Sequence, residues 1–197
     1  MIFIRRICKK LIALPLLLSL LVSCTAGGTL LLCEKLFCDY NANICYTIKS
    51  DGDIISGSAK VKKDDGVILE LLSPDIFGGI TIKSEEDSPQ TISFSYYGID
   101  TKLPQGSLSK INLLLSLFSD MIPSRLSSPG GLEKSPVSDY TIGEKKLDTA
   151  CRSDFTHDDV EYSVIYDSIS GIPYEMSAKS GNVSVSAVIE EFIPEKD

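Results

Sequence analysis

Hydrophobic and polar residues alternate one by one along much of this chain, which is the pattern of a β-strand with one buried and one solvated face. Between positions 37 and 48 the residues of the apolar face are Cys38, Tyr40, Ala42, Ile44, Tyr46 and Ile48. The pattern recurs in nine segments, at 37–48, 55–62, 67–72, 80–83, 91–97, 146–155, 160–166, 172–179 and 183–192. The connections between several of them are hairpin-sized, as at Ser170-Gly171. Connections this short join antiparallel neighbours, so we predict an antiparallel meander.

The later segments predict four further inward-facing sets. They are Leu147, Thr149 and Cys151, then Val160, Tyr162, Val164 and Tyr166, then Ile172, Tyr174 and Met176, and finally Val183, Val185, Ala187 and Ile189.

The segment 109–122 has helical instead of alternating spacing. Its apolar residues are Ile111, Leu113, Leu114, Leu115, Leu117, Phe118, Met121 and Ile122. They cover more than half of a helix surface, so we expect a helix that is buried on more than one side. Pro123 is expected to end it, and 124–137 is expected to be a long loop. The predicted fold is mainly β (α+β): a curved antiparallel sheet, or incomplete β-barrel, of about nine strands wrapped around a central helix.

The first 23 residues differ in kind from the rest. A basic segment with Arg5, Arg6, Lys9 and Lys10 precedes an apolar run of about 12 residues. This run is shorter than the roughly 20 residues that a membrane-spanning helix needs. The order Leu21-Val22-Ser23-Cys24 resembles the bacterial lipobox. The resemblance implies cleavage before Cys24 and a diacylglycerol on its sulfur, with acyl chains such as palmitate anchoring the protein to a membrane.

This division predicts a lipoprotein signal peptide at 1–23, a lipidated cysteine and tether at 24–35, and a single domain at 36–197. The apolar stretch from Leu30 to Leu36 is expected to form a helical turn, packed on the domain or lying near the membrane. No second span of about 20 apolar residues follows, so the domain is expected outside the membrane, in an extracytoplasmic location.

The charge of the chain argues against nucleic acid as a partner. The formal net charge is −8, with 19 basic and 27 acidic residues. Without the four basic residues of the signal segment, 15 basic residues remain against 27 acidic ones. Phosphate binding needs a clustered basic surface, which this composition does not favour.

The order of strands and helix resembles the LolA/LolB-like fold of bacterial carriers of lipoproteins and related lipid binders. The residues that carry the resemblance are Leu71-Leu72-Ser73-Pro74 before Gly79-Ile80, Tyr97-Gly98-Ile99 before Leu103-Pro104, and Gly171-Ile172-Pro173. The resemblance as a whole covers roughly residues 36–193. The sequence shows no exposed hydrophobic loop like the one attributed to LolB at membranes.

The resemblance implies that acyl chains bind between sheet and helix. Small inward residues at Ala42, Gly57 and Ala59 would leave room there, or else the helix itself fills the space as ordinary core. The residues expected to line such a cavity are Tyr40, Ala42, Ala59, Phe94, Tyr96, Ile111, Leu114, Leu115, Phe118, Tyr162 and Val164.

Catalytic and metal-binding patterns are not found. The single histidine, His157, lies beside Asp158 and Asp159 in an expected hairpin tip without further ligands at metal-like spacing. No nucleophile-elbow sequence accompanies it. We therefore predict a protein that is not an enzyme and that needs no cofactor or metal.

Cysteines 33, 38, 45 and 151 follow the lipidated one. Cys38 and Cys151 are both expected to face inward and are the best candidates for a disulfide, the alternative being buried free thiols. The sequence as a whole predicts a membrane-anchored extracytoplasmic lipoprotein that binds a lipid or other hydrophobic ligand. The alternative is a non-catalytic structural or protein-interaction module of the cell envelope.

Overall fold

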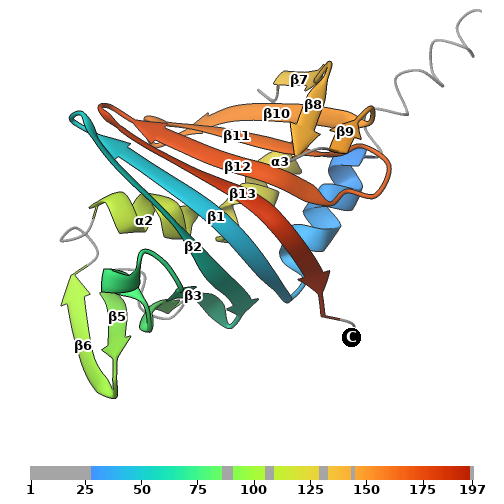
Figure 1. The fold of residues 1–197 in the computed structure, drawn as a ribbon. Helices are drawn as coiled ribbons and strands as arrows, with labels where there is room; N and C mark the ends of the chain where they lie inside the picture. The colour runs from blue at the N-terminus through green and yellow to red at the C-terminus, as the bar shows by residue number, and fades with distance from the viewer. Residues whose placement is uncertain (1–27, 86–90, 105–108, 129–132, 143–144, 196–197) are drawn as a thin grey trace, which may run out of the picture.

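Eleven antiparallel strands form one open, curved sheet in the computed structural model (Figure 1), which describes residues 28–85, 91–104, 109–128, 133–142 and 145–195. The strands, with a short 3-10 helix η1, are β1 (Tyr40–Ser50), β2 (Asp53–Asp64), β3 (Gly66–Leu71), η1 (Asp75–Phe77), β4 (Ile80–Glu85), β5 (Thr91–Tyr96), β6 (Ile99–Pro104), β7 (Glu133–Pro136), β10 (Ala150–His157), β11 (Val160–Asp167), β12 (Pro173–Ser180) and β13 (Val183–Pro194). Their order is β6-β5-β4-β3-β2-β1-β13-β12-β11-β10-β7. The first strand, β1, and the last, β13, thus pair with each other in the interior of the sheet, and β6 and β7 form its edges. The predicted mainly β fold class is confirmed, with more strands in the described chain than the nine expected.

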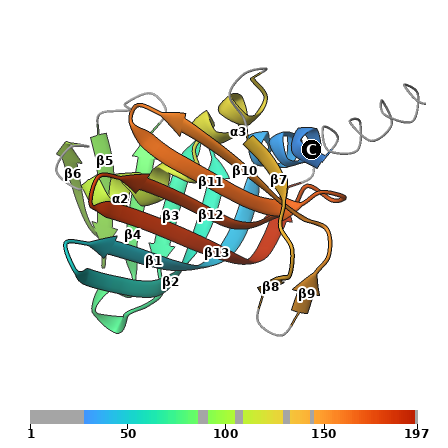
Figure 2. The same ribbon diagram turned by 90° about the horizontal axis from the view of Figure 1, so that it is seen from above.

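Helices cover one face of this sheet (Figures 1 and 2). Residues 28–37 are helical, and α2 (Ser109–Ser116) and α3 (Met121–Leu126) follow β6. Helix α2 packs on β12 and β13, and α3 packs on β10. Side chains from all three helices join the inward faces of the strands in one buried core.

The inward faces of β1 and β11 are those that the alternation predicts. Tyr40, Ala42, Ile44, Tyr46 and Ile48 are all buried. So are Tyr162, Val164 and Tyr166.

The predicted helix at 109–122 is two helices. Residues 117–120 interrupt it, and Pro123 lies inside α3 instead of ending a helix. Proline is tolerated in the first turn, where the backbone N–H has no intrahelical acceptor to lose. The hydroxyl of Ser116 donates to the carbonyl of Leu113, a local bond that competes with continued helix. The expected burial on more than one side is present: Leu113, Leu114, Leu117 and Ile122 are buried.

Two of the predicted inward sets are wrong in part, because Cys151 and Met176 pack with the main core as expected but Leu147 and Tyr174 do not. The chain turns between β9 (Lys145–Leu147) and β10, so Leu147 belongs to a separate cluster with Ala150 and Ile165. An irregularity in the β11–β12 pairing, after Ile165, places Tyr174 in that cluster too, while Met176 stays in the main core. An extra residue in one strand changes which face its neighbours point to.

A two-stranded ribbon formed by β8 (Tyr140–Ile142) and β9 completes this cluster. Tyr140 stacks on Tyr174 with ring centroids 6.3 Å apart, and its hydroxyl donates to Glu175 at 2.9 Å. Burial, followed by this bond and the charge of Glu175, raises the pKa of Tyr140.

The stretch assigned to a tether partly belongs to the folded domain. Thr29, Leu32, Cys33 and Leu36 are buried at the i, i+3, i+4, i+7 spacing of an amphipathic helix. The hydroxyls of Thr29 and Tyr166 are hydrogen-bonded at 2.7 Å. Of the two placements expected for Leu30–Leu36, the structure thus has the packed one. The segment predicted to be a signal peptide, and Cys24, lie outside the described residues.

Candidate functional site

An apolar groove of about 390 Å³ lies between the β1–β5 half of the sheet and the beginning of α2. Its lining consists of Tyr46, Ile48, Ile55, Leu71, Phe77, Ile80, Ile82, Phe94, Lys110 and Ile111. The strands contribute their inward-facing residues, η1 contributes Phe77, and α2 contributes Lys110 and Ile111. This volume and composition fall within the range of small-molecule sites.

Two polar groups reach the groove lining. The hydroxyl of Tyr46 donates to the carbonyl of Ser73 at 2.9 Å, and burial raises the pKa of this tyrosine. The tyrosine hydroxyl is therefore already engaged and stays protonated at neutral pH. Among the described residues of the lining, Lys110 is the one that carries a charge. The groove thus offers a ligand an apolar wall and a single cation.

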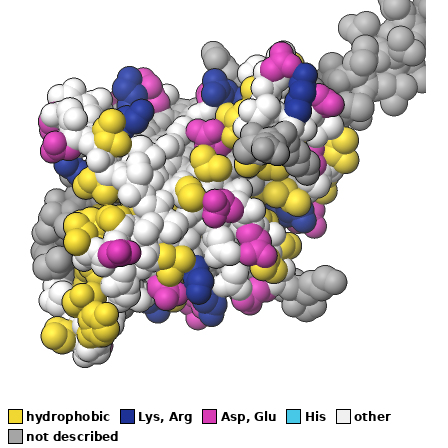
Figure 3. Space-filling model, viewed as in Figure 1, with side chains coloured by type: hydrophobic (Ala, Val, Ile, Leu, Met, Phe, Trp, Pro, Cys, Tyr) yellow, Lys and Arg dark blue, Asp and Glu magenta, His cyan; other side chains and the backbone are white. Residues whose placement is uncertain are grey.

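Exposed hydrophobic side chains adjoin the lining residues in the chain. Ile54 precedes Ile55, Leu72 follows Leu71, and Ile76, at 77% exposure, precedes Phe77. The β5–β6 hairpin adds Tyr97 and Ile99, which are 83% and 72% exposed. Hydrophobic side chains gather visibly at the β5–β6 end of the molecule (Figure 3). The sequence did not predict an exposed hydrophobic loop like the one attributed to LolB, and the structure adds that this hairpin exposes Tyr97 and Ile99.

Of the eleven residues predicted to line a cavity, Phe94 and Ile111 line the groove. Eight others are fully packed in the core: Tyr40, Ala42, Ala59, Leu114, Leu115, Phe118, Tyr162 and Val164. Tyr96 is 44% exposed at the end of β5, with its ring 4.5 Å from that of Tyr97. It pairs with Ile80 and so shares the face of the groove residues, as the alternation predicts, but at the end of the strand it is not part of the groove lining.

The small inward residues leave no room of their own. Ala42 and Ala59 are in the packed core, and a side chain at Gly57 would collide with the carbonyl of Ser73. The segment after β3 therefore occupies the space beside Gly57. The free space lies instead beside Lys110 and Ile111 at the beginning of α2, and the buried leucines that follow in this helix do not line it.

The alternation alone could have found most of the missed lining residues. Tyr46, Ile48, Ile82 and Leu71 share the inward faces of their strands with residues that were predicted. What singles them out is their position opposite the first turn of α2, which depends on how the helix is placed over the sheet.

The four cysteines of the described chain are free thiols, so the predicted bond between Cys38 and Cys151 is not formed. Cys38 precedes β1, whereas Cys151 lies on β10, and three strands separate β1 from β10. Four strand spacings amount to about 19 Å, far beyond the roughly 7 Å that a disulfide allows between Cα atoms.

His157 lies at the β10–β11 turn, on the surface. Its Nδ1 is 2.9 Å from Nη2 of Arg125 on α3, and its Nε2 is 3.5 Å from Asp158. Within the described residues, no three His, Cys, Asp or Glu side chains gather as a metal ion would need. Nor does any described helix have the length and apolar character to cross a membrane.

No family model matches the chain, and no curated protein sequence matches it. Solved structures do match. They include a LolA superfamily protein from Nitrosomonas europaea at 9% identity, covering 88% of this chain and 94% of that one with a TM-score of 0.42. LprF from Mycobacterium bovis matches at 8% identity over 87% of this chain and 94% of its own, with a TM-score of 0.46.

The Mycobacterium tuberculosis lipoprotein LppX matches at 10% identity over 79% of this chain and 88% of its own, with a TM-score of 0.41. The identities and TM-scores describe a loose likeness, so what this chain binds has to come from its own residues. The chain is thus similar to LolA superfamily structures, the resemblance that its sequence motifs predict.

Proposed function

We propose that this protein is a membrane-anchored extracytoplasmic lipoprotein that binds a lipid or another hydrophobic ligand in the apolar groove. The observation that carries the proposal is the groove itself, whose lining is apolar except for Lys110 and the engaged hydroxyl of Tyr46. Desolvating an acyl chain against such walls is favourable by about 0.8 kcal/mol for each CH₂ buried.

The exposed hydrophobic residues beside the groove support the same ligand class. Monomeric proteins expose few contiguous apolar patches unless these serve binding. Ile76, which is 77% exposed, directly precedes the lining residue Phe77, so exposed apolar surface continues from the groove at η1. Lys110 would meet an anionic or polar head group at the groove wall.

The groove can be tested by filling it. Ile80 is half-buried on β4 and lines the groove, so Ile80→Trp should displace a ligand. Binding of a fluorescent acyl-chain probe, dansylundecanoic acid, should weaken at least about tenfold. The matched control is Ile68→Trp, a half-buried residue of β3 whose side chain lines hollows outside the groove. Equal binding by both variants, with unfolding curves like that of the parent, would contradict the proposal.

The anchor needs a separate test, because Cys24 lies outside the described residues. Replacement Cys24→Ala should abolish labelling by radioactive palmitate and release the protein from the membrane fraction. Cys45→Ala removes an exposed thiol of β1 and should leave labelling unchanged. Persistent labelling of the Cys24→Ala protein would show that the anchor is elsewhere. A failed anchor test would leave the groove proposal standing.

A further inference from the structure

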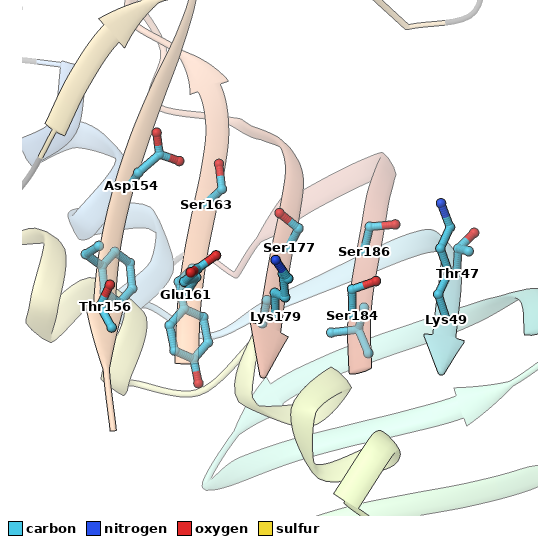
Figure 4. Close-up of a pocket in the computed structure, with 14 residues that line it drawn as sticks. Thr47, Lys49, Asp154, Thr156, Glu161, Ser163, Ser177, Lys179, Ser184 and Ser186 are labelled. Carbon is cyan, nitrogen blue, oxygen red and sulfur yellow. The ribbon is translucent and has the colours of Figure 1, made fainter. Parts of the chain in front are cut away.

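A second and larger hollow, of about 650 Å³, lies over five neighbouring strands of the sheet, β1, β13, β12, β11 and β10 (Figure 4). Six hydroxyl side chains line it: Thr47, Thr156, Ser163, Ser177, Ser184 and Ser186. These residues alternate along their strands with the buried residues of the main core, so they lie on the face opposite the helices. We call this hollow the hydroxyl trough.

Strand register aligns these side chains in two rows across the sheet. One row runs Thr47, Ser186, Ser177, Ser163 and Asp154. The next runs Lys49, Ser184, Lys179, Glu161 and Thr156. Neighbouring strands are about 4.8 Å apart, so each row offers a hydrogen-bonding group at regular intervals over about 19 Å. The labelled side chains of both rows are seen together in Figure 4.

Ser163 lies in the first row between Ser177 and Asp154. Its Oγ is closed off from solvent and has no hydrogen-bond partner among the described residues. A buried hydroxyl without a partner costs free energy, and most such groups in folded proteins are satisfied. Because Oγ is closed off, a polar molecule in the trough would become its partner only if the side chains around Ser163 moved aside.

The chemistry of the trough narrows the class of that molecule. Lys49 and Lys179 balance Asp154 and Glu161, so the trough has no net charge although the chain is acidic. A strongly anionic or cationic ligand would need a charge of one sign. The apolar lining residues of the trough, Phe155, Tyr162, Ala178 and Val185, belong to the main core on the other face of the sheet, so an acyl chain would find less apolar wall here than in the groove. Hydroxyls both donate and accept hydrogen bonds, and this matches a ligand that carries many hydroxyls itself.

We propose that the hydroxyl trough binds a neutral carbohydrate chain, laid across the strands along the two rows. The site is on the opposite face of the sheet from the apolar groove and does not depend on what the groove binds. Its specificity would come from hydrogen bonds to the central hydroxyls, and its charged pairs would flank the chain.

The test uses the full-length protein in a detergent without a sugar head group, because a glycoside detergent would compete. Three neutral probes, cellotetraose, maltotetraose and N,N′,N″,N‴-tetraacetylchitotetraose, are titrated by microscale thermophoresis. At least one should bind with a Kd below about 10 mM. The double variant Ser163→Ala/Ser177→Ala should bind that probe about tenfold more weakly, since each lost hydrogen bond contributes a factor of a few.

The matched control is Ser95→Ala, which removes a hydroxyl from β5 outside the trough. It should bind the probe as the parent does, and all variants should keep the parent's thermal unfolding midpoint and acyl-probe affinity. The anionic polysaccharide polygalacturonate is titrated in the same way for comparison. Three results would overturn the proposal: no binding of any of the three neutral probes, binding by the double variant as tight as that of the parent, or binding of polygalacturonate but of no neutral probe.

Discussion

The ammonium of Lys63 on β2 lies 2.7 Å from the carboxylate of Asp120, between α2 and α3, with 6% of the lysine side chain exposed. The same Nζ donates to the carbonyl of Phe37 at 3.3 Å and lies 5.9 Å from the centre of the Tyr40 ring. One buried cation therefore contacts three parts of the fold: strand β2, the end of the helix at 28–37 (the N-terminal helix), and the break between α2 and α3.

We expect Asp120→Ala to destabilise the fold, because it leaves the charge of Lys63 buried without its partner. Removing one member of a buried pair costs about 3–5 kcal/mol, and the 45% exposure of Asp120 reduces this to about 1–3 kcal/mol. The second change Lys63→Met should restore part of the loss. Urea unfolding of the single and double variants measures both effects.

An exposed pair on the same strand provides the control. Lys62 and Asp64 are 2.8 Å apart with side chains 49% and 31% exposed. Replacement Asp64→Ala should cost about 0–1 kcal/mol. Equal losses for Asp64→Ala and Asp120→Ala would contradict the role assigned to Lys63.

The turn between β11 and β12 holds the N-terminal helix in place. Gly171 has φ +70°, and an added Cβ there would meet the backbone between Leu31 and Leu32 at 2.5–2.6 Å. Gly171→Ala thus combines a left-handed conformation with a collision, and should cost more than about 2 kcal/mol. The helix should also become more sensitive to limited proteolysis near residue 35.

Gly181 serves as a control that separates the cost of the left-handed backbone conformation from the cost of the collision. Its φ is +55°, yet an added Cβ there would meet nothing within 4 Å. Gly181→Ala should therefore cost about 1 kcal/mol, from backbone strain alone. If thermal unfolding shows the same loss for both glycines, the contact with the N-terminal helix contributes nothing.

The same turn makes the fold sensitive to acid. Partial burial raises the pKa of Asp167, but hydrogen bonds from Ser170, Thr149 and the backbone amides of Ile169 and Ser170 outweigh it, so the pKa lies below its usual value. A carboxyl with a lowered pKa in the folded state stabilises the fold fully above its unfolded pKa of about 3.9. This contribution is lost as the pH falls through the folded pKa.

We therefore expect Asp167→Asn to lower the free energy of unfolding by about 1–2 kcal/mol at pH 7, and by less at each step below pH 4. Urea unfolding at pH 7, 4, 3 and 2 measures the difference between parent and variant. The exposed Asp65, in the turn between β2 and β3, serves as the control through Asp65→Asn. A difference for Asp167→Asn that stays constant down to pH 2 would contradict the assignment.

Local patterns in the sequence predicted the strands well because alternation is a property of neighbouring residues. The inward face of β1 follows directly from residues 40–48. The break before α3 was missed because Pro123 is compatible with a first turn as well as with a helix end. The outward turn of Tyr174 was missed because it depends on the irregular pairing of two strands.

The sequence suggested an apolar cavity between sheet and helix, but most of the residues named for it are not the ones that line the groove. Leu114, Leu115 and Phe118 have the same apolar character as Ile111, yet they fill the core, and the free volume lies beside Ile111. Only the placement of α2 over the sheet separates the two groups. That placement rests on contacts between residues far apart in the chain, which spacing within one segment does not reveal.

Lys110 should select among apolar ligands by their head groups, because it is the one charge among the described residues that line the groove. We expect Lys110→Glu to weaken binding of palmitic acid by about 3–10-fold while changing that of 1-monopalmitoylglycerol less than about twofold. Lys110→Met keeps most of the apolar stem and should fall between the two for the acid. Competition against the dansylated acyl probe measures all three proteins, and added salt should narrow the difference for the acid. Equal losses for acid and glyceride would show that Lys110 contributes through its methylene stem and that the groove does not distinguish head groups by charge.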